Sequence, residues 1–227
     1  MDRRETASPP APPAGELPSS CDVSDACDVL GIDAARTGLL RPLWPACPRL
    51  AGLLTTVRLE AAAASATPLP QLLEVMAQAE GGLLLVDLAG RTDVQCWGSV
   101  LATAARRYGI EGALVNGAAR DVDDLCELGF PTYGRGVYPG RILGRLRLAA
   151  VDEPVDLDGT RVDPRSFAVA DSSGAVFVPQ ARVEEVLALA AERLATEREQ
   201  LQAVMAGADP RAISGGSVGK LVPGQSG

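Results

Sequence analysis

Apolar positions along the chain recur with two different spacings, which alternate between predicted strands and predicted helices. A continuous apolar run, Leu83 to Val86, ends at Asp87 and is typical of a strand that is buried on both faces. Residues 97–108 (W-G-S-V-L-A-T-A-A-R-R-Y) follow with helical spacing, and Gly98 opens that helix. The first turn of such a helix exposes free backbone N–H groups that suit a carboxylate.

A second strand and helix follow directly. The apolar run Ala113 to Val115 stops at Asn116-Gly117, which predicts a turn, and Arg120-Asp121 comes three residues later, before a short acidic amphipathic segment. Residues 83–130 therefore predict a strand–helix–strand–helix unit with a right-handed crossover. The polar residues at its strand ends lie at the edge where open α/β sheets bind ligands.

The rest of the chain predicts elements that enlarge this unit. A glycine inside one predicted strand, Gly52, indicates a bulge or a close backbone approach. The predicted elements are a helix over 20–30 that ends at Gly31, a strand over 49–59, a helix over 69–79, short strands within 141–152 and 167–170, a hairpin turned at 171–174, and a helix over 183–205.

The pattern predicts one α/β domain with a central, mostly parallel sheet and a long C-terminal helix. Residues 1–16 form a Pro/Ala-rich head that we expect to be disordered, residues 17–206 the folded domain, and residues 207–227 a Gly/Ser-rich tail. A chain of 227 residues suffices for one substantial core.

Composition narrows the classes of partner. The net charge of −8 and the pI near 4.7 argue against nucleic acid and against anionic membrane surfaces. No apolar run is long enough for a membrane span, and no secretory signal is evident. The five cysteines form no C-x-x-C, so we expect reduced thiols and a cytoplasmic protein.

The chain also lacks the most common catalytic side chains. It contains no histidine, which excludes histidine bases, histidine metal sites and Ser-His-Asp triads. Its single lysine, Lys220, lies in the predicted tail, so a Schiff base is not expected. A metal would need oxygen or thiolate ligands, which makes oxygen-ligated Mg²⁺ or Mn²⁺ the expected cofactor.

The arginine, the carboxylate and the helix N-terminus together suit a small α-keto acid. Arg120 can bind the substrate carboxylate, and Asp121 can carry a cation that polarises the keto oxygen when a carbon–carbon bond breaks. Simpler interpretations remain open from the residues alone: Arg120-Asp121 as a surface ion pair or helix cap, Asp25 as a helix-surface or capping carboxylate rather than a site residue, and Cys126 as an inert rather than a reactive thiol.

Several motifs resemble one known family. They are W-G-S-V-L-A-T-A-A, G-I-E-G-A-L-V-N-G-A-A-R-D-V-D-D-L and G-F-P-T-Y-G-R-G-V-Y-P, with C-D-V-S-D-A-C-D-V-L-G, R-L-A-G-L-L-T-T-V-R and A-D-S-S-G-A-V-F-V-P outside them. Over about residues 17–205 the chain is similar to the family of the regulator of ribonuclease activity A and the 4-hydroxy-4-methyl-2-oxoglutarate/4-carboxy-4-hydroxy-2-oxoadipate aldolases. The resemblance implies a swivelling β/β/α-type fold and a homotrimer or homohexamer with sites between subunits.

The resemblance also implies roles for individual residues. Arg120 would bind the pyruvate carboxylate and Asp121 the divalent metal, and these two would be the catalytic residues. Glu197 of a neighbouring subunit would approach the metal through water, with Glu199 as the competing match. The backbone contacts to substrate would come from Gly98, Ser99, Val100 and Leu101.

Three departures from the family pattern bear on the substrate. Asn116 stands where the family usually has aspartate, and the block that begins at Gly52 lacks the usual G-P-A. Asp87 is followed by Leu88-Ala89-Gly90, where the family usually has two glycines after the aspartate (D-G-G). Metal and pyruvate recognition should survive these changes. They leave open whether the remainder of the substrate pocket is the family's usual one.

The resemblance and the residues together predict a class II, metal-dependent lyase. It would cleave a 4-hydroxy-2-oxo acid to pyruvate, decarboxylate oxaloacetate, or both, through a metal-stabilised enolate. One alternative is a biosynthetic paralogue that uses the same site for isomerisation, dehydration or condensation. Another is a non-enzymatic regulator that binds a ribonuclease-type partner.

Overall fold

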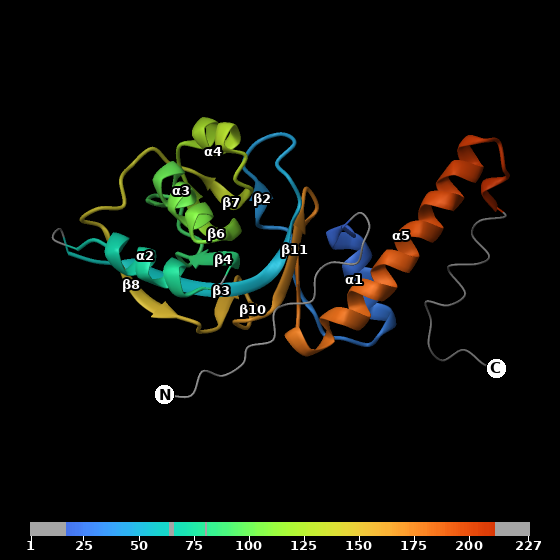
Figure 1. Cartoon of the computed structure of the whole chain (residues 1–227), viewed down its shortest axis with the longest axis horizontal. Helices are drawn as coiled ribbons and strands as arrows, with labels where there is room; N and C mark the ends of the chain where they lie inside the picture. Colours follow the sequence, from blue (N-terminus) through green and yellow to red (C-terminus); the bar gives the residue numbers. More distant parts are fainter. Residues whose placement is uncertain (1–16, 64–65, 80, 212–227) are drawn as a thin grey trace.

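Four parallel strands form the centre of the sheet, in agreement with the predicted crossover unit. The computed structural model describes residues 17–63, 66–79 and 81–211 (Figure 1). Its helices are α1 (Ser20–Val29), α2 (Leu69–Gln78), α3 (Ser99–Arg107), α4 (Val122–Leu128) and α5 (Val183–Met205), with a 3₁₀ turn η1 (Gln180–Arg182). Its strands are β1 (Ala35–Thr37), β2 (Arg41–Pro42), β3 (Leu50–Ala61), β4 (Gly82–Asp87), β5 (Gln95–Trp97), β6 (Ile110–Ala119), β7 (Thr132–Val137), β8 (Leu146–Val151), β9 (Val155–Leu157), β10 (Thr160–Val162), β11 (Phe167–Asp171) and β12 (Gly174–Val178).

The sheet is mixed rather than uniformly parallel. Its order is β1-β12-β11-β3-β4-β6-β7-β2, and β5 pairs with β6 while β8 pairs with β3. The pairs β3–β4, β4–β6, β6–β7 and β5–β6 are parallel. The β11–β12 hairpin, β1, β8 and β2 add antiparallel strands. The predicted α/β class with a long C-terminal helix is confirmed, and short antiparallel strands enlarge the predicted sheet.

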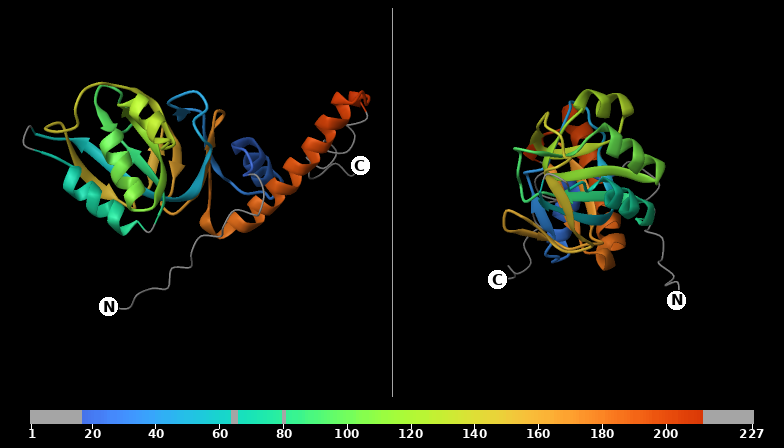
Figure 2. Two further views of the ribbon diagram at one scale, coloured as in Figure 1. Left: turned by 45° about the horizontal axis from the view of Figure 1, so that its top comes forward. Right: turned by 90° about the vertical axis from the view of Figure 1, so that its left-hand side faces the viewer.

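Three apolar clusters fill the spaces between the layers. The first packs α2, α3 and α4 against one face of the central strands, and the second packs β9–β10 and the hairpin against the other face. The third packs α1 and α5 against the far side of the hairpin. In Figure 1 and in the left view of Figure 2, α2, α3 and α4 therefore lie at one end of the molecule and α5 extends from the other.

The predicted helices form largely where the apolar periodicity places them. The first begins at a capping box: Ser19 caps the backbone N–H of Asp22, and the Asp22 side chain accepts from the Ser19 N–H. Gly31 follows α1 with φ 62°, as expected for a residue after a helix end. Gly52 also behaves as predicted, because a Cβ there would lie 3.1 Å from the Leu83 side chain on the neighbouring strand.

One predicted turn is wrong. β6 does not stop at Asn116-Gly117 but continues to Ala119, and its pairing with β7 shifts register between Val115 and Ala118. A Cβ on Gly117 would lie 3.1 to 3.3 Å from atoms of Leu88, Arg91 and Cys96, so the glycine serves a close approach inside the sheet. The chain reverses instead at Asp121.

The helix predicted over residues 97–108, which precedes β6, begins later than predicted, as α3 at Ser99. Trp97 belongs to β5, because the segment before Gly98 pairs with the end of β6. The strands β1, β2, β5, β7, β9 and β10 were not predicted, since runs of two to six residues carry too little periodic signal. The predicted head (1–16) and most of the predicted tail (207–227) lie outside the described residues.

The carboxylate of Asp171 joins α1 to the turn between β11 and β12. It accepts hydrogen bonds from the Ser20 N–H (2.7 Å), the Ser20 hydroxyl (2.8 Å) and the Ser173 N–H (2.8 Å), and it lies 3.7 Å from Arg49 Nε. Burial alone would raise the pKa of this carboxyl, but these donors hold its pKa below the ordinary value of 3.8.

We expect Asp171→Asn to lower the free energy of unfolding by about 1–3 kcal/mol at pH 7, because it leaves buried donors without a charged acceptor. Because the folded pKa is lowered, this contribution is present above pH 3.8 and is lost as the pH falls through the folded pKa. Urea titrations at pH 7 and pH 3 measure the effect. The exposed Asp163→Asn is the control; an equal loss in the two variants, or one independent of pH, would contradict the assignment.

Among the described residues, no helix is long and apolar enough to cross a membrane.

The five cysteines are all free; Cys27 and Cys96 are buried, whereas Cys21 and Cys126 are exposed. Burial raises the pKa of Cys27 to about 11.

Candidate functional site

A left-handed turn at the end of β6 presents Arg120 and Asp121 side by side. The Arg120 N–H donates to the Trp97 carbonyl (2.9 Å), which ties the strand end to β5. Asp121 then adopts φ 54° and ψ 42°, a conformation that aspartate and asparagine tolerate better than most side chains, and α4 begins after it. Arg120 Nε donates to Asp121 Oδ2 (3.2 Å). Both side chains stay accessible, with 36% and 28% of their surfaces exposed.

The N-terminus of α3 lies against the same carboxylate. The Ser99 N–H and hydroxyl both donate to Asp121 Oδ2, at 3.3 and 3.2 Å. Gly98 makes this approach feasible, because a Cβ there would lie 2.8 Å from Asp121 Oδ2 and 3.1 Å from Arg120 Cγ. Its φ of −171° is ordinary extended backbone, so closeness rather than backbone conformation requires the glycine.

These groups open into a small pocket of about 140 Å³. The N–H groups of Val100 and Leu101 have no intrahelical acceptor, since the helix has no side-chain cap and its first backbone bond runs from Ala102 to Gly98. Backbone donors and a guanidinium thus line the same cavity. The lining residues are Leu69, Gln95, Gly98, Val100, Leu101, Arg120, Asp121, Arg141, Ile142 and Leu143.

The structure brings together all the residues for which the sequence predicted substrate contact. Gly98, Val100, Leu101, Arg120 and Asp121 line the pocket, and Ser99 bonds to Asp121. The helix N-terminus and the strand end meet because β5 pairs with the last residues of β6.

Asp87 and Asn116, by contrast, lie on the other face of the sheet. Side chains alternate along a strand, and Asp87 shares the parity of Leu83 and Leu85, which belong to the cluster opposite the helices. Both residues are buried. Asn116 donates to Asp87 (2.6 Å) and to the Asp156 carbonyl in β9 (3.4 Å).

The interpretation of Asp87 as part of the ligand edge is therefore corrected. The departures at Asn116 and Gly52 also lie outside the pocket, so neither touches a ligand bound there. Arg135 joins the buried cluster, donating to Asn116 and to Asp158 of the β9–β10 turn. This network holds the hairpin β9–β10 to the sheet.

Glu197 and Glu199 lie on the exposed outer half of α5, at the end of the molecule opposite α3 and α4 (Figure 1). Neither can approach Asp121 of the same chain. Asp25 pairs with Arg193 of α5 (3.7 Å), in agreement with its interpretation as a helix-surface carboxylate. Cys126 is exposed on α4 but does not line the pocket.

Two polar lining residues escaped prediction. Gln95 belongs to β5, and Arg141 follows the glycine-rich exit of β7, so neither falls in a periodic segment. The Gly140-Arg141 step after a proline could have drawn attention to Arg141. No signal in the sequence distinguishes Gln95.

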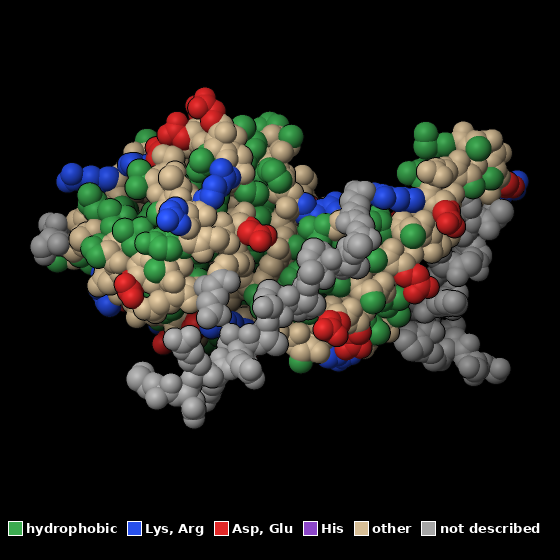
Figure 3. Space-filling view, in the orientation of Figure 1, with side chains coloured by type: hydrophobic (Ala, Val, Ile, Leu, Met, Phe, Trp, Pro, Cys, Tyr) green, Lys and Arg blue, Asp and Glu red, His purple; other side chains and the backbone are tan. Residues whose placement is uncertain are grey.

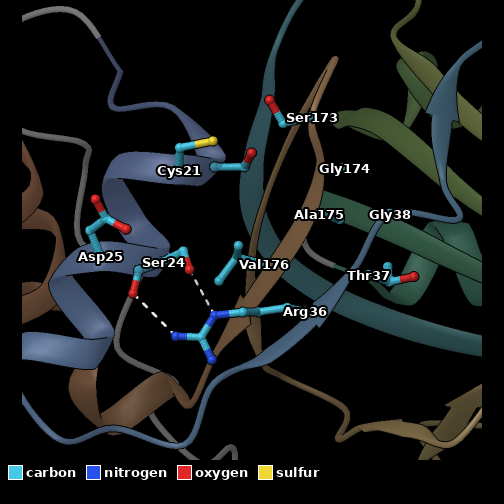
Figure 4. Close-up of a pocket in the computed structure, with 11 residues that line it drawn as sticks. Cys21, Ser24, Asp25, Arg36, Thr37, Gly38, Ser173, Gly174, Ala175 and Val176 are labelled. Carbon is cyan, nitrogen blue, oxygen red and sulfur yellow. Dashed lines mark hydrogen bonds between the residues drawn. The ribbon is translucent and has the colours of Figure 1, made fainter.

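A second hollow, of about 320 Å³, lies between α1, β1 and the β11–β12 turn (Figure 4). Its one arginine, Arg36, is already committed to α1: it donates to the Ser24 hydroxyl (2.7 Å) and carbonyl (3.1 Å) and pairs with Asp28. The hollow is open and offers no free cationic group. The pocket at Arg120 is the stronger candidate.

The donor set at Asp121 fits Mg²⁺ or Mn²⁺ as a site with a single carboxylate ligand. The described residues contain no group of three or more His, Cys, Asp or Glu side chains that could enclose an ion. Asp121 Oδ2 is occupied by Ser99 and Arg120, whereas Oδ1 has no protein partner within the described chain. Mg²⁺ commonly binds through one carboxylate together with waters and substrate oxygens.

Residues 20–177 match the family model described as RraA-like (Aldolase/RraA). The chain belongs to the RraA-like family. The predicted resemblance is thereby confirmed, and the matched range includes every pocket-lining residue.

Individual relatives of this RraA-like chain carry different kinds of name. A protein of Halalkalibacterium halodurans named "Putative 4-hydroxy-4-methyl-2-oxoglutarate aldolase" is 26% identical over 83% of the chain and 85% of its own length. Protein DlpA of Legionella pneumophila is 30% identical over 46% of the chain, which spans only 17% of DlpA. The structure of Streptomyces coelicolor RraAS2, described as an unusual member of the RNase ES inhibitor RraA protein family, has a TM-score of 0.70 and 27% identity, with 81% of the chain and 92% of RraAS2 covered.

Proposed function

We propose that this RraA-like protein is a divalent-metal-dependent lyase that cleaves a 4-hydroxy-2-oxo acid to pyruvate, decarboxylates oxaloacetate, or both. The observation that carries the proposal is the shared cavity of Arg120, Asp121 and the free N–H groups of α3. Relatives named as aldolases support the reaction class.

The chain's own groups are suited to hold the α-keto acid. Within the described residues, neither Nη atom of Arg120 has a hydrogen-bond partner, so both can bind the substrate carboxylate as a fork. The N–H groups of Val100 and Leu101 supply further donors to the same anion. Ser99 and Arg120 Nε fix Asp121 Oδ2 and leave Oδ1 for Mg²⁺ or Mn²⁺.

The cleavage itself requires charge stabilisation rather than a protein nucleophile. As the C3–C4 bond breaks, its electron pair moves onto C3 and the keto oxygen, and the proton of the 4-hydroxyl leaves; C3 later takes up a proton to give pyruvate. A cation held at Asp121 would act as a Lewis acid on the keto oxygen. Arg120 neutralises the adjacent carboxylate, and solvent water in the pocket moves the proton, since no histidine or lysine lines it.

Metal removal tests the proposal. We expect that EDTA abolishes pyruvate release from 4-hydroxy-4-methyl-2-oxoglutarate and from oxaloacetate, and that Mg²⁺ or Mn²⁺ restores it. A lactate dehydrogenase-coupled assay measures pyruvate, and far-UV circular dichroism checks that the metal-free protein stays folded. Activity that persists unchanged in excess EDTA would refute the metal requirement.

A homo-oligomer, a trimer or a pair of trimers, would complete this site. The outer half of α5 stands clear of its own domain and exposes Leu201 and Met205, at 60% and 79% (Figure 1). Glu197 on that half could approach Asp121 only from another copy. Multi-angle light scattering should give three or six chains; a monomer would exclude a contribution from α5.

A regulator that binds a ribonuclease is the second candidate, since RraAS2 is described as belonging to an RNase inhibitor family. Acidic side chains over α4 and along α5 (Figure 3) would suit a basic protein surface better than nucleic acid. Stoichiometric capture of one partner, without metal-dependent turnover, would favour this function.

A further inference from the structure

A buried polar network lies on the face of the sheet away from the candidate pocket. Its centre is Asn116, which is 0% exposed; its side chain donates to Asp87 (2.6 Å) and accepts a hydrogen bond from Arg135 Nε. Asp87 is 5% exposed and the Arg135 side chain 13%. A polar atom displaced within so buried a network finds little water to replace its partner, so these bonds hold Asn116 in place.

The network fixes the turn that follows β4. The Asn116 carbonyl accepts the N–H groups of Leu88 (3.0 Å) and Gly90 (3.1 Å). The Ala89 N–H between them donates to the Asp87 carboxylate (2.9 Å). Ala89 has a φ of 51°, in the left-handed region that disfavours alanine, so the turn depends on these bonds to keep its shape.

The network also crosses a bulge in β6. Between two regular pairs of the parallel strands, β6 has Asn116 and Gly117 where β7 has only Arg135. Bulges often lie beside active sites, where they change the direction of the strand that follows. Arg135 bonds to the Asn116 side chain and also packs on Gly90, since a Cβ there would lie 3.1 Å from Arg135 Cζ. The bulge is thereby tied to the turn after β4.

Both of these segments lead directly to the candidate site. From the bulge, β6 continues for two residues to Arg120-Asp121. From the turn, the chain continues into β5, whose last residue, Trp97, accepts the Arg120 N–H (2.9 Å). Ser99, two residues after β5, donates to Asp121 Oδ2 through its N–H and its hydroxyl. Because β5 and β6 pair at only two positions, the place of Asp121 depends on the segments that precede both strands.

We propose that Asn116 is a positioning residue for the candidate site. With Asp87 and Arg135, it fixes the placement of β5 relative to the end of β6, and thereby the Asp121 carboxylate. None of these three network side chains lines the pocket, so they act through the backbone of the turn and the bulge. The reaction that the positioned carboxylate serves rests on the proposed function, whereas the positioning itself rests on the contacts of Asn116.

A swap of the amide and the carboxylate tests this role. Asn116→Asp places a second carboxylate against Asp87, at a contact where 2.6 Å separates a donor from its acceptor, so the like charges should force the two side chains apart. We expect kcat/KM to fall about 10- to 100-fold, since misplacement of a catalytic group by about 1 Å can cost about 100-fold. The double variant Asp87→Asn/Asn116→Asp again sets one amide against one carboxylate at the same net charge, and should recover most of the loss.

Hydrogen–deuterium exchange reports the placement without any reaction. In Asn116→Asp, peptides that span β5 and the end of β6 should exchange about 10-fold faster than in the wild-type protein, because local opening becomes easier there. The double variant should return to the wild-type rate. Val169→Ala is the control: it removes buried atoms from the cluster beneath α1 and α5, and should lower the melting temperature but leave kcat/KM and the exchange of these peptides unchanged.

Two outcomes separate the positioning role from the proposed function. Arg135→Met keeps the side-chain length but removes the donors, and it replaces Asn116→Asp if that variant does not fold. Wild-type exchange over β5 in the folded variant, or a double variant as damaged as Asn116→Asp, overturns the positioning role. If exchange changes as expected but the wild-type protein with Mg²⁺ releases no pyruvate from 4-hydroxy-4-methyl-2-oxoglutarate or oxaloacetate, the positioning role stands and the proposed function fails.

Discussion

Arg120→Ala and Asp121→Asn should each lower kcat/KM for a 4-hydroxy-2-oxo acid by about 100- to 1000-fold, the range for removal of one preorganised charge-stabilising group. Arg120→Ala removes the fork that binds the substrate carboxylate. Asp121→Asn keeps the side-chain shape and tolerates the left-handed φ of 54°, so the turn should survive while the anionic oxygen is lost.

The two substitutions should not be additive. Arg120 Nε and Asp121 Oδ2 lie 3.2 Å apart, so each variant also disturbs the group that the other removes. The double variant should therefore lose little more than the more damaging single one. Arg120→Lys, which keeps the charge but not the fork, should fall between wild type and Arg120→Ala.

Steady-state kinetics with the pyruvate-coupled assay measure kcat and KM for each variant. Arg107→Ala is the matched control, because it removes an exposed arginine from the other end of α3. If Arg120→Ala and Asp121→Asn both turned over substrate at the rate of that control, the pair would be a surface ion pair only, the simpler interpretation of the sequence.

The location of the candidate site could be predicted because its residues are close together in the sequence and lie at the ends of strongly periodic elements. Arg120 and Asp121 follow a buried strand, and Gly98 opens an amphipathic helix, so strand and helix periodicity alone place both at one sheet edge. Their contact depends on β5, a strand of three residues. No periodic signal can identify so short an element.

The errors at Asp87 and Asn116-Gly117 have a common physical cause. A polar residue at a strand end indicates the edge of the sheet but not the face. Because side chains alternate along a strand, the face depends on whether the residue lies an even or an odd number of positions from the core residues of that strand. Gly117 resembles a turn glycine in sequence, yet the side chains of Leu88 and Cys96 from other segments make it necessary. Long-range packing determined both outcomes.

The second prediction with a large expected effect is the substitution of Gly98 at the start of α3. Gly98→Ala should lower kcat/KM by about 10- to 100-fold while the melting temperature changes little. The added Cβ would lie 2.8 Å from Asp121 Oδ2, the far end of a flexible side chain, which can move at little energetic cost. The displacement would shift the carboxylate from Ser99 and Arg120, and misplacement by about 1 Å can cost about 100-fold in rate.

Gly109→Ala, at the other end of the same helix, provides the opposite pattern. Nothing lies within 4 Å of a Cβ there, but its φ of 80° is in the left-handed region, so alanine should cost about 1 kcal/mol of stability and leave kcat/KM unchanged. Melting curves and kinetics of the two variants therefore separate a steric effect on the site from a general loss of stability. A Gly98→Ala protein with wild-type kcat/KM would mean that the position of the Asp121 carboxylate does not limit the reaction, and the proposed role of Asp121 would fail with it.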